Sequence, residues 1–504
     1  MIRAGQLSAR VAANESSPAT SESSVTTMKR SYAWHESAST RCVLVLTIVA
    51  AILRLSFLGS KSLWFDESLT AYRVALPYNS LLNLPDPAKL NMPLYYLLLH
   101  EWTALAGSSE FMLRLPSAVF GVLTVPLVYF LGVQLGDRRA GLWAALLLTV
   151  NATCIEYAQT ARSYSMFIAL AMLASVCFIS SVKGGSNRSF ASYLVSAILA
   201  VYTHLFGIFA LPSQWLSLFL FRPPRKTALA LTGCMLAIPI LSLPALVPAA
   251  SGFYPQLSWV PRTSLHSLTE MFMLFAGALD AGPTILTALL TASYLTGIAL
   301  AVRRVARPGP GYLLLSICVP VVLIVAISIV KPLFVPRYLL AELPLFALLA
   351  AIGLRGLKPA LAIAMVCAIA MLSLGEDYAY YRAPSLEDWR GMVAFVATHS
   401  KPGDAMLIFP GYYIFPVGYY VAQREHPETF PHRIFTTPVA GEWNSVVTPE
   451  RLPTAAELAG YPRVWLTSGQ GLDRAAIEMM FPLERVVDVP EFAGVRLFLL
   501  ERVR

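Results

Sequence analysis

Long uncharged apolar stretches limit the fold of this chain more than any other feature. Residues 43–58 hold one charge, Arg54, and four later stretches hold none: 115–135, 227–247, 312–330 and 359–374. Each has about 16 to 21 residues, close to the roughly 20 that a helix needs to cross a bilayer. Only 13% of all residues are charged, about half the fraction found in soluble domains. The sequence therefore predicts an integral membrane protein that crosses the bilayer about eleven times.

The net charge of +9 is explained by where the basic residues lie. Many of them form short clusters at alternate ends of the apolar stretches: Arg138/Arg139, Lys183/Arg188, Arg222/Arg225/Lys226, Arg303/Arg304/Arg307 and Arg355/Lys358. Basic loops stay on the cytoplasmic side of a membrane, so this pattern puts the N-terminus inside and residues 376–504 outside. Membrane orientation accounts for the charge, and no nucleic-acid partner is expected.

The first two regions of the chain are distinguished by composition. Residues 1–41 are rich in Ser, Thr and Ala and are predicted to be a disordered cytoplasmic N-terminus. Residues 42–375 are predicted to form an all-α transmembrane bundle with a first external loop at 60–114. Within that loop, residues 93–106 favour a helix lying along the membrane surface, because the segment is too short and too polar to span the membrane.

The six cysteines fit neither a metal site nor a disulfide framework and are expected to be small buried apolar residues.

The third region, residues 376–504, has a different pattern. Pro and charged residues return, and a helical segment at 389–399 is followed by short apolar runs at 405–409, 463–467 and 495–500. Helical segments that alternate with buried strands are typical of an α/β domain. We therefore predict a small extracytoplasmic α/β domain after the bundle.

Two adjacent carboxylates, Asp66 and Glu67, follow the first apolar stretch directly. Polar side chains beside an apolar bundle are costly to bury and often mark function. Here they would lie at the membrane surface, where a lipid-linked substrate presents its head group, and they are candidate catalytic residues. In the alternative interpretation, Asp66 caps a following helix and Glu67 lies in its first turn. The residue types alone leave both interpretations open.

Two later external turns add charge at the same side of the predicted bundle. The first contains Glu156, Gln159 and Arg162, and the second contains Lys331, Arg337 and Tyr338. Two cations in one external turn go against the orientation bias, which favours an anionic ligand there. Arginine holds phosphate through paired hydrogen bonds, and a carboxylate can activate an acceptor hydroxyl. His204, in a further turn, is either a ligand or a structural histidine.

Six short segments occur in a fixed order between residues 50 and 345. They are LWFDES (63–68), NMPLYYLLLH (91–100), SEFMLRLPSAVFG (109–121), AQTARSY (158–164), YTHLF (202–206) and VPRYLL (335–340). In this order they resemble the polytopic, C-type glycosyltransferases of family 39 and their bacterial relatives, which include protein O-mannosyltransferases and the lipid A aminoarabinose transferase. Residues 386–410 also resemble the start of the soluble domain of the bacterial members.

The resemblance implies the C-type glycosyltransferase fold and a reaction. A sugar would pass from a polyprenyl-phosphate donor to a lipid, glycan or protein acceptor on the outer face of the bacterial cytoplasmic membrane, with inversion at the anomeric centre. Asp66 would be the general base, with Glu67 secondary. The donor phosphate would bind Arg162, Lys331, Arg337 and Tyr338, and the acceptor or sugar would bind Tyr95, Gln159 and His204.

The chain departs from the family pattern at two places. Asn91-Met92-Pro93 stands where relatives often have His-Pro-Pro, and Thr160 stands where many have a Glu that helps to hold a metal ion. No cofactor is assigned. A divalent metal stays open, with Glu156, one helical turn before Thr160, as its candidate ligand.

Two other classes of protein compete with the transferase. A transporter or flippase would use the same external charges to gate a path for its substrate. Transporters, however, usually carry acids near the midplane or repeat symmetry, whereas the charges here lie mostly at helix ends, apart from Glu342. A scaffold protein with an external binding domain would perform no chemistry that depends on Asp66.

Overall fold

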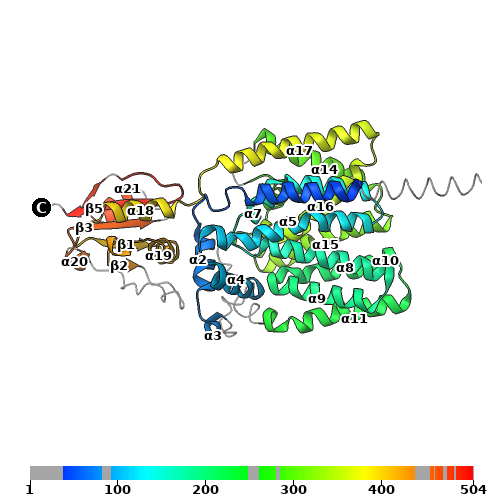
Figure 1. The fold of residues 1–504 in the computed structure, drawn as a ribbon, viewed down its shortest axis with the longest axis horizontal. Coiled ribbons are helices and arrows are strands. Elements are labelled where there is room, and N and C mark those ends of the chain that lie inside the picture. Colours follow the sequence, from blue (N-terminus) through cyan, green and yellow to red (C-terminus); the bar gives the residue numbers. More distant parts are fainter. Residues whose placement is uncertain are drawn as a thin grey trace, which may run out of the picture.

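A computed structural model describes residues 38–81, 92–247, 260–279, 284–436, 455–458, 460–468, 474–481, 484–487 and 489–502 of the chain. It contains a large helical bundle and a small α/β domain packed at one end of that bundle (Figure 1). The predicted fold class is confirmed. Most of the N-terminal segment predicted to be disordered, residues 1–41, lies outside the described residues.

Seven helices in the described residues are long and apolar enough to cross a membrane. They are the first helix Ala38–Leu55, α5 (Glu110–Gln134), α8 (Tyr164–Gly184), α14 (Ile285–Val302), α15 (Pro308–Val330), Pro336–Leu354 (η2, Pro336–Glu342, with α16, Leu343–Leu354) and α17 (Pro359–Arg382). The shorter helices α9 (Asn187–Thr203), η1 (Leu205–Phe209) with α10 (Ala210–Phe221), and α11 (Arg225–Leu241) fall where the fifth to seventh spans were predicted. Of these, only the Leu205–Phe221 pair passes as an apolar helix within the described residues. The count of eleven stays a prediction.

An eighth candidate span is a pair of helices that meet at an angle of 61°, α6 (Arg138–Thr149) and α7 (Ala152–Ala158). The break leaves backbone carbonyls at the end of α6 without helical partners. Arg54, the only charge in the first predicted span, donates to two of them, Leu148 O at 2.8 Å and Thr149 O at 3.2 Å. The side chain of Asn151 caps α7 by accepting from Cys154 N at 3.0 Å. Arg54 therefore satisfies the carbonyls of a bent helix instead of facing lipid.

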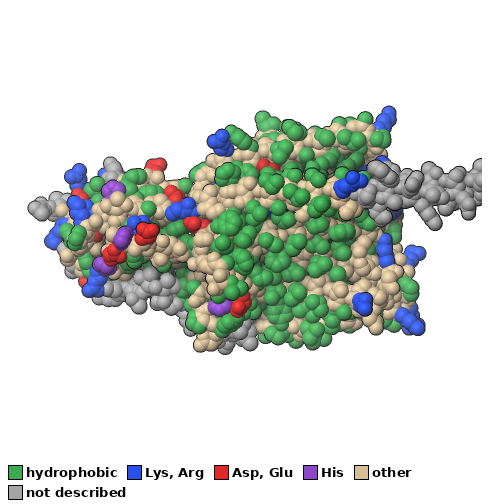
Figure 2. Space-filling model, viewed as in Figure 1, with side chains coloured by type: hydrophobic (Ala, Val, Ile, Leu, Met, Phe, Trp, Pro, Cys, Tyr) green, Lys and Arg blue, Asp and Glu red, His purple; other side chains and the backbone are tan. Residues whose placement is uncertain are grey.

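The outer surface of the bundle is apolar, as a lipid-facing surface must be (Figure 2). Large apolar side chains such as Leu361, Ile363 and Met371 of α17 are more than half exposed, whereas every residue of α16 is buried in the bundle. The prediction that the cysteines are buried was wrong for Cys42, Cys318 and Cys367, which are exposed. These three are small apolar groups on helix surfaces that face outward.

Lys and Arg side chains gather at the end of the bundle opposite the α/β domain (Figure 2). The helix ends at that side include the junctions of α5 with α6, of α8 with α9 and of α14 with α15, where the predicted basic clusters lie. The α/β domain therefore occupies the end that is poor in such clusters.

Close helix contacts in the bundle use glycine. A Cβ on Gly353 of α16 would overlap the backbone carbonyl of Gly297 of α14, and one on Gly132 of α5 would lie 2.5 Å from Gly141 Cα of α6. Small residues allow membrane helices to approach closely enough for dense van der Waals packing.

The predicted first external loop contains three helices, α2 (Phe65–Val74), α3 (Tyr78–Leu81) and α4 (Pro93–Ala106). The α4 helix has the predicted bounds, and it begins with proline at its first turn and ends at Gly107, whose φ of +82° suits a glycine cap. It buries Tyr95, Tyr96 and Leu99, so one face of α4 packs against the protein.

The C-terminal domain contains a five-stranded sheet in the order β2-β1-β3-β5-β4. Its strands are β1 (Ala405–Phe409), β2 (Arg433–Thr436), β3 (Arg463–Ser468), β4 (Glu484–Val487) and β5 (Arg496–Arg502), and its helices are α18 (Trp389–His399), α19 (Ile414–Ala422), α20 (Ala455–Leu458) and α21 (Arg474–Met480). β1 pairs in parallel with β2 and β3, and β5 is antiparallel to β3 and β4. The helix and three strands predicted from the sequence are all present. The bundle also contains α13 (Leu265–Ala276), and α17 extends beyond the predicted domain boundary at residue 375.

Candidate active site

The paired carboxylates lie in the first turn of α2, which begins at Phe65. A helix N-terminus favours negative charge, because its first backbone N–H groups have no helical partner. The two side chains nevertheless have different surroundings. Asp66 is 19% exposed, whereas Glu67 is 1% exposed. Only Asp66 is accessible from outside.

Glu67 is bound on both of its carboxylate oxygens. Oε1 accepts from Arg114 Nε at 2.8 Å and from Ala161 N at 2.7 Å. Oε2 accepts from Arg114 Nη2 at 2.6 Å and from Trp64 N at 3.4 Å. This buried pair joins α2 to α5 and to the turn that carries Arg162.

Arg114 uses its remaining donors on backbone carbonyls between the first helix and α2. Nη1 donates to Leu58 O at 3.0 Å and to Lys61 O at 2.8 Å, and Nη2 donates to Ser62 O at 3.2 Å. All five N–H groups of the guanidinium are thus engaged. Sequence reasoning assigned Arg114 no role, although an arginine near the start of a long apolar helix was a visible signal.

Asp66 faces a buried guanidinium. Arg162 Nη2 lies 3.7 Å from Asp66 Oδ2, and Nη1 lies 3.5 Å from both Asp66 O and Thr70 Oγ1. Arg162 is 9% exposed, and its Nε has no hydrogen-bond partner among the described residues. Burial lowers the pKa of Arg162, but Asp66 and nearby tyrosines more than offset this, so the pKa lies above its ordinary value. The group remains a cation.

The second external cation group approaches the same carboxylate. Arg337 interacts electrostatically with Asp66 and with the tyrosines Tyr164 and Tyr338. Its guanidinium carbon lies 5.9 Å from the centre of the adjacent Tyr338 ring. Lys331 follows the end of α15 and begins the segment that leads to Arg337. The structure thus brings Asp66, Arg162 and Arg337 together from three separate parts of the chain.

His204 lies inside an aromatic cluster beside these cations. Its ring stacks on Phe167 at 4.9 Å and lies 5.4 Å from Tyr338. The Nδ1 atom accepts a hydrogen bond from Phe206 N at 3.3 Å, and the residue is 3% exposed. These contacts give His204 a structural environment next to Tyr338.

Two other predicted ligands make hydrogen bonds inside the protein. Tyr95 is fully buried, and its hydroxyl lies 3.1 Å from Ser117 Oγ, which donates to Arg162 O at 3.1 Å. Gln159 Nε2 donates to three carbonyls at the end of the first helix, the nearest being Ser56 O at 2.7 Å, and Gln159 Oε1 accepts from Tyr380 OH at 3.0 Å. Both residues hold the frame around Arg162.

Glu156 points to a different neighbourhood. It interacts electrostatically with Lys61 and Tyr380. In the described part of the chain, no three His, Cys, Asp or Glu side chains gather as they would around a metal ion. The residues present therefore do not form a recognisable metal centre around Glu156.

The C-terminal domain contacts the start of α2 directly. Glu387 Oε2 accepts from Phe65 N at 2.7 Å and from Trp389 Nε1 at 2.6 Å. Burial raises the pKa of Glu387, and these two donors oppose the rise. Tyr420 OH accepts from Leu63 N at 2.6 Å. Sequence reasoning found neither contact, because each joins residues more than 300 positions apart.

Comparison with solved structures shows which fold this is. The chain matches ArnT from Cupriavidus metallidurans in the apo state at 13% identity with a TM-score of 0.59, over 92% of this chain and 98% of that one. It matches ArnT from the same organism bound to undecaprenyl phosphate at 13% identity with a TM-score of 0.56, over 92% and 98%. It also matches the oligosaccharyltransferase AglB from Archaeoglobus fulgidus in complex with an inhibitory peptide and a dolichol-phosphate, at 14% identity with a TM-score of 0.54, over 89% and 70%.

These matches and the candidate membrane spans define a multi-pass membrane protein with the C-type glycosyltransferase (GT-C) fold. Residues 87–259, about a third of the chain, match the family described as dolichyl-phosphate-mannose-protein mannosyltransferase. The resemblance predicted from the sequence is confirmed. A search among curated proteins gives no match.

Proposed function

We propose that this protein transfers a sugar from a polyprenyl-phosphate donor to an acceptor on the outer side of the bacterial cytoplasmic membrane. The observation that carries the proposal is the pairing of an accessible carboxylate, Asp66, with the buried guanidinium of Arg162 at the surface end of the bundle. ArnT has been crystallised with undecaprenyl phosphate and AglB with a dolichol-phosphate. Their shared fold supports a lipid-phosphate donor here.

The proposed reaction is a single displacement. Asp66 takes the proton from the acceptor hydroxyl, whose oxygen bonds to the anomeric carbon as the bond from that carbon to the phosphate oxygen breaks. The phosphate leaves with the electron pair as polyprenyl phosphate, so it needs no general acid. Arg162 and Arg337 stabilise the charge that develops on it. Attack opposite the leaving group inverts the anomeric centre.

The other predicted site residues divide into two groups. We propose that Lys331 and Tyr338 complete the phosphate site and that His204 shapes it by packing against Tyr338. Glu67, Gln159 and Tyr95 are proposed to position the site, because each is committed to hydrogen bonds inside the protein. No step is assigned to a metal, since Glu156 has Lys61 and Tyr380 as its electrostatic neighbours.

The orientation follows from the positive-inside rule. The end of the bundle with the basic clusters is proposed to face the cytoplasm, and the α/β domain is proposed to lie outside (Figure 2). This puts Asp66 on the outer side, where a lipid-linked sugar and an envelope acceptor would meet.

The test compares Asp66→Asn with the wild-type protein, both purified in lipid nanodiscs with a radiolabelled polyprenyl-phosphate sugar and a cell-envelope extract as the acceptor. Asparagine keeps the shape of the side chain but cannot take a proton, so transfer should fall by about 10²–10⁴-fold. Glu101→Gln is the matched control, because Glu101 is an exposed acid on the nearby helix α4. That variant should transfer sugar at the wild-type rate.

Full transfer by Asp66→Asn would remove Asp66 as the base and make Glu156 the next residue to test. Transbilayer movement of a lipid-linked substrate by the wild type, without any transfer, would favour the flippase alternative. Mass spectrometry of the labelled product identifies the sugar and the acceptor together.

A further inference from the structure

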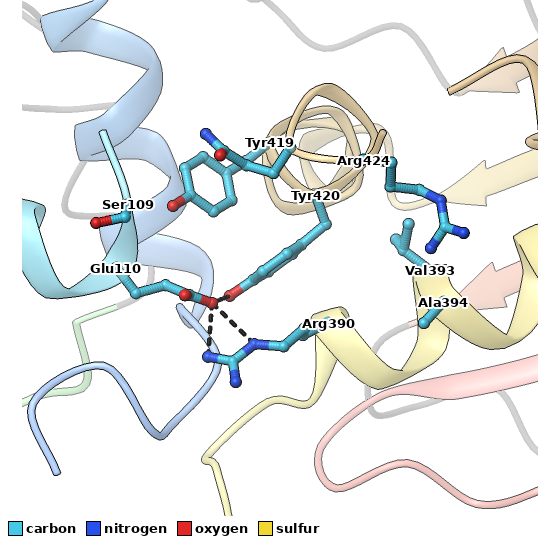
Figure 3. A pocket seen from close by; sticks show the side chains of 9 residues that line it. Ser109, Glu110, Arg390, Val393, Ala394, Tyr419, Tyr420 and Arg424 are labelled. Carbon is cyan, nitrogen blue, oxygen red and sulfur yellow. Dashed lines mark hydrogen bonds and ion pairs between the residues drawn. The ribbon is translucent and has the colours of Figure 1, made fainter. Parts of the chain in front are cut away.

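A pocket of about 330 Å³ lies between the membrane domain and the C-terminal domain (Figure 3). One wall is the start of α5, which carries Glu110. The other walls come from α18, with Arg390 and Ala394, and from α19 and the turn after it. The volume is within the range of small-molecule sites, which often lie at domain interfaces.

Glu110, on the membrane-domain wall of this pocket, is paired with Arg390 of the C-terminal domain. Arg390 Nη2 lies 2.6 Å from Glu110 Oε1, and Tyr420 OH donates to the same oxygen at 2.9 Å. Arg390 Nε also donates to Glu110 Oε1 at 2.8 Å, Nη1 donates to Ser60 O, and Nη2 donates to Gly59 O as well. The Glu110 carboxylate is therefore neutralised, and Arg390 has little capacity left for a ligand.

Arg424 adds a further positive charge to the pocket lining. It follows α19 and lies across the pocket from Ser109 and Glu110 (Figure 3). Its Nε is buried without a hydrogen-bond partner, and it forms no ion pair within the described ranges. An arginine fork binds a carboxylate or a phosphate through two parallel hydrogen bonds. The wall opposite Arg424 carries no unpaired acid that would repel such an anion.

Two tyrosine rings lie between these charged ends. The rings of Tyr419 and Tyr420 are 4.9 Å apart and nearly perpendicular, at 87°. Tyrosine has an apolar ring and a polar tip, so such rings can pack against the C–H face of a sugar while nearby polar groups bond its hydroxyls. Gln423 and Ser109 supply such groups. An aromatic and polar pocket with one available cation suits a sugar that carries an acidic group.

We propose that this pocket binds an acidic sugar of a glycan or glycolipid acceptor. The proposal rests on the transferase function given above. Tyr420, in the pocket wall, is bonded to Leu63 N at 2.6 Å. Leu63 and Asp66 are three residues apart in sequence, a span of at most about 11 Å even in an extended chain. An acceptor held in this pocket is thus within a few sugar lengths of the proposed base.

The experiment measures binding to the full-length protein in nanodiscs by saturation-transfer NMR, with four probes: glucuronic acid, glucose 6-phosphate, glucose and sulfate. Arg424→Gln removes the available cation, and Ala394→Trp fills the pocket from an exposed position of α18. Arg485→Gln, at an exposed position of β4, is the matched control. We expect an acidic sugar to bind the wild type and the control. Arg424→Gln should lose at least tenfold in affinity, as expected for a lost hydrogen bond to a charged group, and Ala394→Trp should lose at least as much because its ring occupies the pocket.

Preference for glucuronic acid would assign a carboxylate ligand, and preference for glucose 6-phosphate a phosphate ligand; both support the proposal. Equal binding of glucose, sulfate binding as tight as that of either acidic sugar, or unchanged affinity in Arg424→Gln would overturn it. The assay requires no transfer. Acidic-sugar binding by a protein that never transfers sugar would therefore refute the proposed function while leaving the pocket assignment in place.

Discussion

Glu387 of the C-terminal domain accepts a hydrogen bond from the backbone nitrogen of Phe65, the residue immediately before Asp66, at 2.7 Å. The ring of Phe65 also lies 5.1 Å from that of Tyr412. The small α/β domain thus caps the helix that begins the site. We infer that its docking sets the position of the Asp66 carboxylate.

Glu387→Ala is expected to lower the turnover number with little change in donor KM. The loss leaves Phe65 N without its acceptor, and a small misplacement of a catalytic group can cost up to about 10²-fold in rate. Glu387→Gln keeps an oxygen that can accept from Phe65 N and Trp389 Nε1, so it should recover most of the activity. Steady-state kinetics of the two variants provide the measurement. Equal loss in both would mean that the charge of Glu387 matters and not its hydrogen bonds.

Glu67→Gln is expected to act on stability before it acts on chemistry. It removes one partner of a buried pair with Arg114 and leaves the guanidinium uncompensated, a change that costs about 3–5 kcal/mol in other proteins. The thermal midpoint in detergent should fall clearly. Transfer, assayed well below that midpoint, should fall less than in Asp66→Asn.

The double variant Glu67→Gln/Arg114→Leu checks this assignment, because removal of both charges should be less costly than the two single changes predict. A Glu67→Gln protein with wild-type stability and no transfer would instead make Glu67 a member of the chemistry.

Features encoded in local sequence were predictable. The bounds of α4 (Pro93–Ala106), α18 (Trp389–His399) and β1 (Ala405–Phe409) could be predicted from their local runs of apolar residues, and α4 is also marked by proline at its start and Gly107 after its end. The long apolar helices followed in the same way. The bend between α6 and α7 was missed, because the hydrogen bonds to its free carbonyls come from Arg54, almost a hundred residues earlier.

The candidate site was predictable only in part, for the same physical reason. The charged groups Asp66, Arg162 and Arg337 could be proposed because charge at the ends of apolar stretches is costly and therefore conspicuous. The different surroundings of Asp66 and Glu67 could not be predicted, since two adjacent carboxylates look alike in sequence until the structure shows that Arg114 pairs with Glu67. Partners that are distant in sequence are selected by three-dimensional packing, which a single sequence does not display.

The orientation predicts a simple reporter result. A reporter that is active only outside the cytoplasm should be active when it is fused after Arg504 or inserted at Gly403, in an exposed turn of the α/β domain. The same reporter fused after Arg139, in a basic cluster at the opposite end, should be silent. The reverse pattern would place Asp66 in the cytoplasm and overturn the proposed site of transfer.

Arg162 and Arg337 are expected to act on the donor through the shape of the guanidinium as well as its charge. Lysine keeps the positive charge but lacks the planar fork that forms two parallel hydrogen bonds with phosphate. In Arg162→Lys and Arg337→Lys, donor KM should therefore rise by about ten- to a hundredfold, the range expected for a lost hydrogen bond to a charged group. Arg382→Lys is the control, since Arg382 is exposed at the end of α17. Arg162→Lys should have the larger effect, because Arg162 is the cation paired with Asp66 and the substitution also disturbs the base. Donor KM unchanged in both variants would rule out these guanidinium groups as the phosphate ligands and leave Lys331 as the next cation to test.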